Sequence, residues 1–266
     1  MKLYIKAVSS YRSDVDNVDI KQALKTQYKM DTRRKDAFML LAIFGAKKLN
    51  DNVVMNANDE LYITSGVGNI GIVKKTYISV IKENECMMPF DFLNMLGNTT
   101  SYYVADSLGI KGKNSFQISN SFTFFNTLVS IYASLYASLK SSKNDAILGS
   151  VDINIEPQEI LQRVLGVVQE TELCNSVNYQ KLSLNPHNAI ASVEFEPISY
   201  SENEIEQLKK TTNTKIVISD RVAKNNSYSF ENMASFAINN AILNQEDIVY
   251  IELFQGRYKV LRVNMI

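Results

Sequence analysis

The fold of this chain is decided by residues 109–152, GIKGKNSFQISNSFTFFNTLVSIYASLYASLKSSKNDAILGSVD. A turn containing Gly109 and Gly112 leads into a short alternating run, 116–119, which predicts a strand. Residues 145–149 predict a second, buried strand. Between the two strands, apolar residues recur at the three- and four-residue spacing of a helix, at Phe125, Leu128, Val129, Tyr132, Tyr136 and Leu139. The order is strand, elbow, buried helix, strand, and such an elbow can present a reacting group at the head of its helix.

The predicted helix carries no charge, so a membrane span has to be considered. From residue 114 to 139, however, twelve of the twenty-six residues are Ser, Thr, Asn or Gln. A bilayer span needs about twenty predominantly apolar residues. We therefore expect a helix packed inside a protein and no membrane span.

The composition is that of an ordinary globular protein. Of 266 residues, 45% are hydrophobic and 21% are charged, and 28 basic residues balance 28 acidic ones, which gives no reason to expect a nucleic-acid partner. Cys86 and Cys174 are too few for a disulfide framework or a metal cluster. Lys6 falls within what would be the apolar part of an export signal. We expect a cytoplasmic protein with no cofactor and no metal.

Strands alternate with helices along the rest of the chain, which predicts an α/β layered fold. The strands are expected near residues 3–8, 61–64, 189–195, 215–219, 248–254 and 258–263, and the helices near 33–49, 74–83, 92–108, 160–168, 200–211 and 231–243.

Three glycines raise the alternative of a nucleotide-binding reductase. Gly66, Gly68 and Gly71 have the spacing of the dinucleotide fingerprint and lie between a predicted strand and a predicted helix. The acidic residue at the right distance, Asp91, lies at a helix start rather than at the end of a second strand. A glycine turn that lets the helix pack on the sheet explains the same residues.

A serine-dependent acyltransferase or hydrolase is a further alternative. Ser121 at the elbow would be its nucleophile, and His187, the single histidine of the chain, its base. Such a pair works only within hydrogen-bond reach. Cys86 and Cys174 both follow acidic residues, which disfavours a thiolate, so neither is expected to be a nucleophile.

The chain resembles the β-ketoacyl synthases of the thiolase fold. The resemblance covers about residues 1–200 and implies a thiolase-like layered fold. Residues 1–200 would form the N-terminal ketosynthase-like half and residues 201–266 a shortened second half of one domain. It is carried, in family order, by Arg33-Arg34-Lys35-Asp36, Gly66-Val67-Gly68, Phe92-Leu93-Asn94-Met95, Gly109-Ile110-Lys111-Gly112, the elbow segment 116–126, and Leu148-Gly149-Ser150-Val151-Asp152.

Two departures from that family imply a catalytically silent protein. The family has a cysteine at the elbow, but that position falls on Ser121 when counted from Gly112 and on Phe122 when the strand alternation is kept in phase. The catalytic histidines of the family lie in the second half, which this chain largely lacks. The tail from Asn232 resembles the short chain-length factors of aryl polyene and related pigment biosynthesis. The resemblance thus implies a pseudoenzyme that pairs with an active β-ketoacyl-acyl-carrier-protein synthase in polyene or fatty-acid-like biosynthesis.

The resemblance also implies roles for particular residues. In thiolase-fold dimers the strand before the elbow pairs across the twofold axis; here it would comprise Ser115, Phe116, Gln117, Ile118 and Ser119. The acyl tunnel of the active subunit would end against the silent one, which touches the acyl carrier protein only indirectly. The expected tunnel-lining residues are Phe92, Met95, Phe122 and Phe124, for which plain core packing is the alternative role.

Overall fold

The computed structural model describes residues 1–119, 121–138, 144–166, 172–220, 227–228 and 232–266. Among these residues, nine strands form one sheet in the order β3-β2-β4-β6-β1-β7-β11-β10-β8. In that order the strands are Asn114–Ile118, Glu60–Ser65, Ala146–Asp152, Ser176–Ser183, Lys2–Arg12, Ala191–Phe195, Arg257–Met265, Ile248–Phe254 and Lys215–Asp220. A small separate sheet joins β5 (Glu172–Leu173) and β9 (Ser227–Tyr228).

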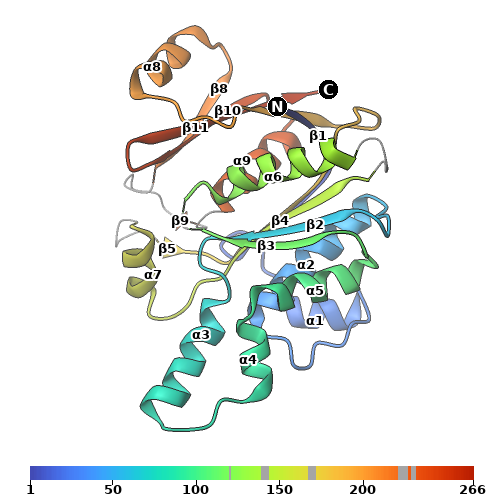
Figure 1. Cartoon of the computed structure of the whole chain (residues 1–266), viewed down its shortest axis with the longest axis vertical. Coiled ribbons are helices and arrows are strands. Elements are labelled where there is room, and N and C mark those ends of the chain that lie inside the picture. Colours follow the sequence, from blue (N-terminus) through green and yellow to red (C-terminus); the bar gives the residue numbers. More distant parts are fainter. Residues whose placement is uncertain (120, 139–143, 167–171, 221–226, 229–231) are drawn as a thin grey trace.

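The large sheet bends into two wings that enclose a layer of helices (Figure 1). We call β3, β2, β4, β6 and β1 the first wing, and β7, β11, β10 and β8 the second wing; β1 joins them because it pairs with both β6 and β7. Helices α6 (Thr123–Ser138) and α9 (Asn232–Leu243) lie between the wings. The outer faces are covered by α1 (Ile20–Thr26), α2 (Ala37–Asn52) and α5 (Gly97–Leu108) on the first wing and by α8 (Glu202–Thr211) on the second. This is the expected layered α/β fold.

Alternation along the strands explains the layers. In β10, Tyr250 faces the middle layer, whereas Val249 and Ile251 face α8. In β2, Tyr62 faces the middle layer and Leu61 faces the helices outside. Successive side chains of a strand point to opposite faces, and both faces are covered here, so these strands are buried almost throughout.

One part of the chain projects from the first wing, and we call it the arm (residues 70–96). It consists of α3 (Ile70–Tyr77), the π-helix η1 (Ile78–Lys82) and α4 (Pro89–Met95) (Figure 1). The helix predicted for 92–108 was wrong in its bounds, because Leu96 is extended and separates α4 from α5. The Phe116 ring packs on the first residue of α5, where a Cβ on Gly97 would come within 2.4 Å of it. Helix α7 (Gln158–Leu165) packs beside α3.

Strand β6 was not predicted at all. Its sequence, SVNYQKLS, has only three apolar residues and its alternation breaks at Lys181, yet all eight residues are buried. Asn178 and Gln180 point into the middle layer, where they bond to Asn232 and Asn239 of α9. Buried polar groups that are paired with each other stay inside a core, so hydropathy alone did not reveal this strand.

The buried face of α6 differs in part from the predicted one. Phe125 and Leu128 are buried as expected, but Tyr136 is exposed and stacks on Tyr132, with 5.9 Å between ring centroids. Leu139 lies outside the described residues. The core side of α6 is formed by Phe124, Phe125, Leu128, Ile131 and Leu135.

Two further expectations concern the chain as a whole. Among the described residues, no helix has both the length and the hydropathy of a membrane span. The division at residue 200 stays a prediction; the second wing takes β7 from the residues before it.

Candidate functional site

The backbone turns sharply between β3 and α6, and the turn falls on Phe122. Its φ is +51°, a region that residues other than glycine rarely enter, and such strain persists only where the surroundings hold it. Its carbonyl accepts a hydrogen bond from the Asn126 N–H, so α6 begins directly after it. Its own N–H donates to Oε1 of Glu252 at 3.2 Å. The elbow expected from the sequence is therefore present in the backbone.

A phenyl ring occupies this elbow. The Phe122 side chain is buried and meets the Phe254 ring edge-on, with centroids 6.2 Å apart. Ser121 precedes the strained residue; its N–H donates to the Ser119 hydroxyl, which in turn donates to the Ser121 carbonyl. The sequence left the position of the missing nucleophile at Ser121 or Phe122, and the backbone strain falls on Phe122.

The structure does not bring Ser121 and His187 together. Strands β2, β3 and β4 are parallel, and Ser121 follows the carboxyl end of β3. Strand β6 is antiparallel to β4, with Leu182 opposite Ala146, so the loop that carries His187 lies beside the amino end of β4. A seven-residue strand spans about 20 Å, far beyond hydrogen-bond reach. The serine-hydrolase alternative gains no support.

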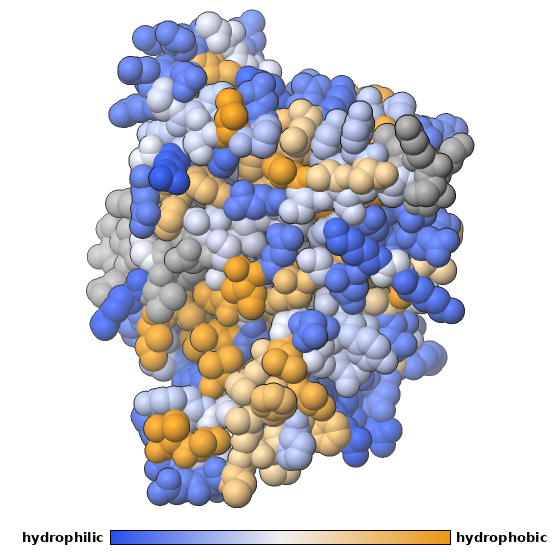
Figure 2. Space-filling model, in the orientation of Figure 1, coloured by the Kyte–Doolittle hydropathy of each residue, from blue (hydrophilic) through white to orange (hydrophobic). Residues whose placement is uncertain are grey.

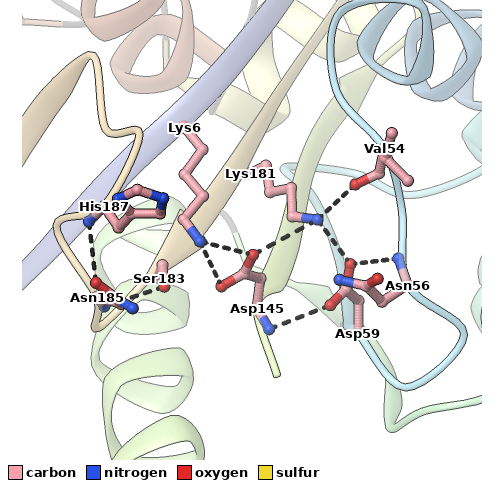
Figure 3. Close-up of polar contacts among 9 residues, drawn as sticks. All are labelled: Lys6, Val54, Asn56, Asp59, Asp145, Lys181, Ser183, Asn185 and His187. Carbon is pink, nitrogen blue, oxygen red and sulfur yellow. Dashed lines mark hydrogen bonds and ion pairs between the residues drawn. The ribbon is translucent and has the colours of Figure 1, made fainter. Parts of the chain in front are cut away.

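His187 instead borders a recess of about 590 Å³ beside an ion-pair network (Figure 3). The Lys181 side chain, 3% exposed, has its Nζ 2.9 Å from Oδ2 of Asp59 and 3.5 Å from Oδ2 of Asp145. Lys6 donates to both carboxyl oxygens of Asp145. These acids and bases satisfy one another and tie β1, β4 and β6 to the loop before β2. Their arrangement indicates a structural role, which is to hold these strands and this loop together.

The backbone N–H groups of the glycine turn after β2 already donate hydrogen bonds to side chains of the protein. The Gly66 N–H donates to Oδ1 of Asp152 at 2.8 Å, and the Gly68 N–H donates to the Ser65 hydroxyl at 2.8 Å. A dinucleotide fingerprint needs such amide groups free for the pyrophosphate. Gly68 has a φ of +63°, and a Cβ there would come within 2.7 Å of Ile118, so local packing explains the glycine. The reductase alternative gains no support either.

Asp152, which is fully buried at the end of β4, accepts hydrogen bonds from both this turn and α9. Oδ1 also accepts from the Ser65 hydroxyl at 2.7 Å, and Oδ2 accepts from Nδ2 of Asn232 at 3.2 Å. Burial raises the pKa of Asp152 to about 7, against the opposing effect of these hydrogen bonds. The network links the base of the arm to the middle layer.

Strand β3 is an outermost strand of the sheet and, within the described part of the chain, pairs only with β2. The Lys113 carbonyl accepts from β2 and the Ser119 N–H donates to β2, so the odd-numbered residues direct their backbone groups inward. The N–H and C=O groups of Asn114, Phe116 and Ile118 therefore point to the open edge. The strand contains no charge and no proline, the usual protection of an edge.

Exposed apolar side chains continue from this edge onto the arm. Ile118, at the end of β3, is 56% exposed. Figure 2 shows hydrophobic residues gathered over α3 and α4, in the lower half of the view. We call the exposed apolar residues of the arm the apolar patch: Val73, Tyr77, Ile81, Met87, Met88, Phe90, Phe92, Leu93 and Leu96. Large exposed apolar patches mark interaction sites.

The four predicted tunnel residues lie in two places. Phe92, exposed, and Met95, half-buried, are on α4 in the arm. Phe122 and Phe124 are buried in the core between the wings. The structure does not gather the four into one cluster, and their chain-length role stays a prediction.

Sequence reasoning missed Glu252 at the elbow. In β10 this residue is in phase with Tyr250 and Phe254, which face the middle layer. A charged residue in step with buried aromatics was the available signal.

Neither cysteine lies at the elbow. Cys86 is exposed in the arm, and Cys174 is buried, which raises the pKa of its thiol to about 11. In the described part of the chain, no group of three or more His, Cys, Asp and Glu residues is placed to hold a metal ion.

No protein-family model and no curated protein matches the chain. Several solved structures do. A chain of the ishigamide ketosynthase/chain length factor superposes with a TM-score of 0.72 at 10% identity, over 100% of both chains. A chain of the ketosynthase ApeO in complex with its chain length factor ApeC, from Xenorhabdus doucetiae, superposes with a TM-score of 0.62 at 10% identity, over 98% of this chain and 99% of that one. An OleA variant from Xanthomonas campestris gives 0.55 at 11% identity, over 99% and 98%. The predicted thiolase-like fold, that of ketosynthase and chain-length-factor proteins, is confirmed.

Proposed function

We propose that the chain is a catalytically silent chain-length factor, which pairs with an active β-ketoacyl-acyl-carrier-protein synthase and shapes its acyl tunnel. The observation that carries this proposal is the open, uncharged edge of β3 beside the apolar patch. A sheet edge and an apolar surface of this kind are liabilities unless a partner covers them. Two of the structural neighbours come from ketosynthase and chain-length-factor assemblies, which supports the choice of partner.

Catalytic silence is supported by what occupies the elbow. A condensing enzyme needs a nucleophile there and groups that move protons beside it. Phe122 supplies neither. The single histidine, His187, lies beside the amino ends of the parallel strands, whereas Phe122 follows the carboxyl end of β3. The absence of a nucleophile from the strained position is the reason to assign the chemistry to the partner.

Pairing would take place through strand addition. The open edge of β3 would bond antiparallel to the corresponding strand of the synthase, and the residues on that edge are Asn114, Phe116 and Ile118. The arm would then lie against the synthase, with Phe92 and Met95 closest to its tunnel. Phe122 and Phe124 would support that surface from the core.

Chain length would be set by overpacking. An acyl chain that grows against a fixed aromatic ring costs about 1–3 kcal/mol once it exceeds the available space. Since about 1.4 kcal/mol is a factor of ten, this biases product length by roughly ten- to a hundredfold.

The biological setting that fits this role is polyene or related fatty-acid-like biosynthesis in the cytoplasm. The acyl carrier protein would dock chiefly on the synthase. Cys86 and Cys174 form no disulfide with each other, which is consistent with a reducing compartment.

Co-expression with the ketosynthase encoded nearby tests the pairing. Expressed alone, the chain is expected to self-associate through its open edge, whereas with the synthase it should elute as a one-to-one complex. An unrelated homodimeric ketosynthase serves as the control and should not be retained. A soluble monomer that ignores the neighbouring synthase would argue against the proposal.

A further inference from the structure

Glu252 places a carboxyl group in the core beside the elbow. It lies in β10 on the face that points to the middle layer, between Tyr250 and Phe254, and is 9% exposed. Its Oε1 accepts a hydrogen bond from the backbone N–H of Phe122 at 3.2 Å. A buried carboxyl group is costly unless it is paired, and the Phe122 N–H is one of the partners of Glu252.

The Phe122 N–H is a chemically important donor. It lies at the N-terminus of α6, a helix of 16 residues, where backbone N–H groups and the helix dipole stabilise negative charge. In acyl transfer by an elbow nucleophile, the backbone N–H of the nucleophilic residue commonly binds the oxyanion that forms on the substrate. Here Glu252 already occupies that donor.

We infer that Glu252 is a second obstacle to catalysis at the elbow, besides the missing nucleophile, and we call it the lock. Its carboxyl group accepts a hydrogen bond from the N–H donor that an acyl oxyanion would need. This inference rests on the proposed silent role and extends it, because Glu252 would prevent catalysis whichever side chain stands at position 122. A thiol introduced there would face a carboxyl group in place of an oxyanion hole. Because the carboxyl group already holds this N–H, the donor is not available to stabilise a thiolate, so the new thiol would be a poor nucleophile.

Alkylation of an introduced thiol tests the lock. Phe122→Cys is compared with Phe122→Cys/Glu252→Ala in their reaction with iodoacetamide, which forms an S–C bond, releases iodide and gives the thiol proton to the buffer. Peptide mass spectrometry separates position 122 from Cys86 and Cys174. Removal of the Glu252 carboxyl group frees the N–H and is expected to speed alkylation at position 122 by at least tenfold and to shift its rate profile to lower pH.

The matched control is Phe122→Cys/Glu246→Ala. Glu246 pairs with Lys215 on the surface, with 2.6 Å between Oε2 and Nζ, and its neutralisation should leave the rate at position 122 unchanged. Equal rates in the Phe122→Cys protein and its Glu252→Ala derivative would overturn the inference.

Hydrogen exchange provides a readout that needs no cysteine. The Phe122 amide should be protected in the wild-type chain and should exchange at least tenfold faster in Glu252→Ala, while the Leu128 amide of the same helix keeps its protection. A Phe122 amide that is unprotected in the wild type would contradict the lock. Neither measurement involves the synthase, so a negative result here leaves the pairing proposal standing, and failed pairing leaves the lock testable.

Discussion

Ile118→Lys is expected to abolish pairing with the synthase while the chain itself stays folded. Ile118 is 56% exposed at the end of β3, where its backbone groups face the open edge. An ammonium group placed there would be buried without a partner once a second strand covers the edge, and edge lysines block strand addition for this reason. We expect the dissociation constant to rise by about a hundredfold or more, or about 2.8 kcal/mol. Titration of the purified synthase with each variant measures it.

Ile218→Lys is the matched control for this variant. Ile218 is 47% exposed on β8, the strand at the other end of the same sheet. The same change of charge at that edge should leave the affinity for the synthase within about twofold, because β8 is not the strand that pairs. Equal loss of affinity in both variants would show that β3 is not the pairing edge.

Asp152→Asn is expected to remove a large pH dependence of stability. The pKa of Asp152 is about 7 in the folded chain against an ordinary value of 3.8, so between these values the folded state holds a proton that the unfolded state has released. The free energy of unfolding of the wild type therefore falls as pH rises through this window, by about 1.4 kcal/mol per unit and about 4 kcal/mol in all. Its contribution is complete below about pH 4 and lost above about pH 7.

Urea unfolding of wild type and Asp152→Asn across pH 4–8 checks this result. The difference between the two proteins isolates Asp152, because the other titrating groups are common to both. Asp106→Asn, a change on the exposed surface of α5, should keep the wild-type slope. If the stability profiles of the wild type and Asp152→Asn were parallel, the pKa of Asp152 in the folded chain would be close to its ordinary value, and the prediction would be wrong.

Elements with a regular apolar pattern were predictable from the sequence, and those with buried polar groups were not. The helix of residues 37–52, in which residues 38–46 are all buried, and the C-terminal strands are rich in apolar residues and lie near their predicted positions. Strand β6 escaped because Asn178, Gln180 and Lys181 are buried in it, each with a partner far away in the chain. Pairing of that kind depends on tertiary structure, which local periodicity does not report.

The candidate site shows the same division. The resemblance identified the elbow segment; counting from Gly112 placed the missing nucleophile at Ser121, and the alternation of the strand placed it at Phe122. Only the backbone placed the strain on Phe122, because a positive φ at a non-glycine residue leaves no trace in hydropathy. The contact between Glu252 and Phe122 joins residues 130 positions apart and likewise needed the fold.

Hydrogen exchange along β3, with and without the synthase, tests the central claim most directly. In the free chain, at a dilution that keeps it monomeric, the amides of Asn114, Phe116 and Ile118, which face the open edge, should exchange rapidly, whereas those of Ser115 and Gln117, which face β2, should be protected. On addition of the synthase, the first three amides should become protected by about a hundredfold or more, as expected for new hydrogen bonds worth about 2.8 kcal/mol. A stable complex in which those three amides still exchange at the free rate would contradict the account.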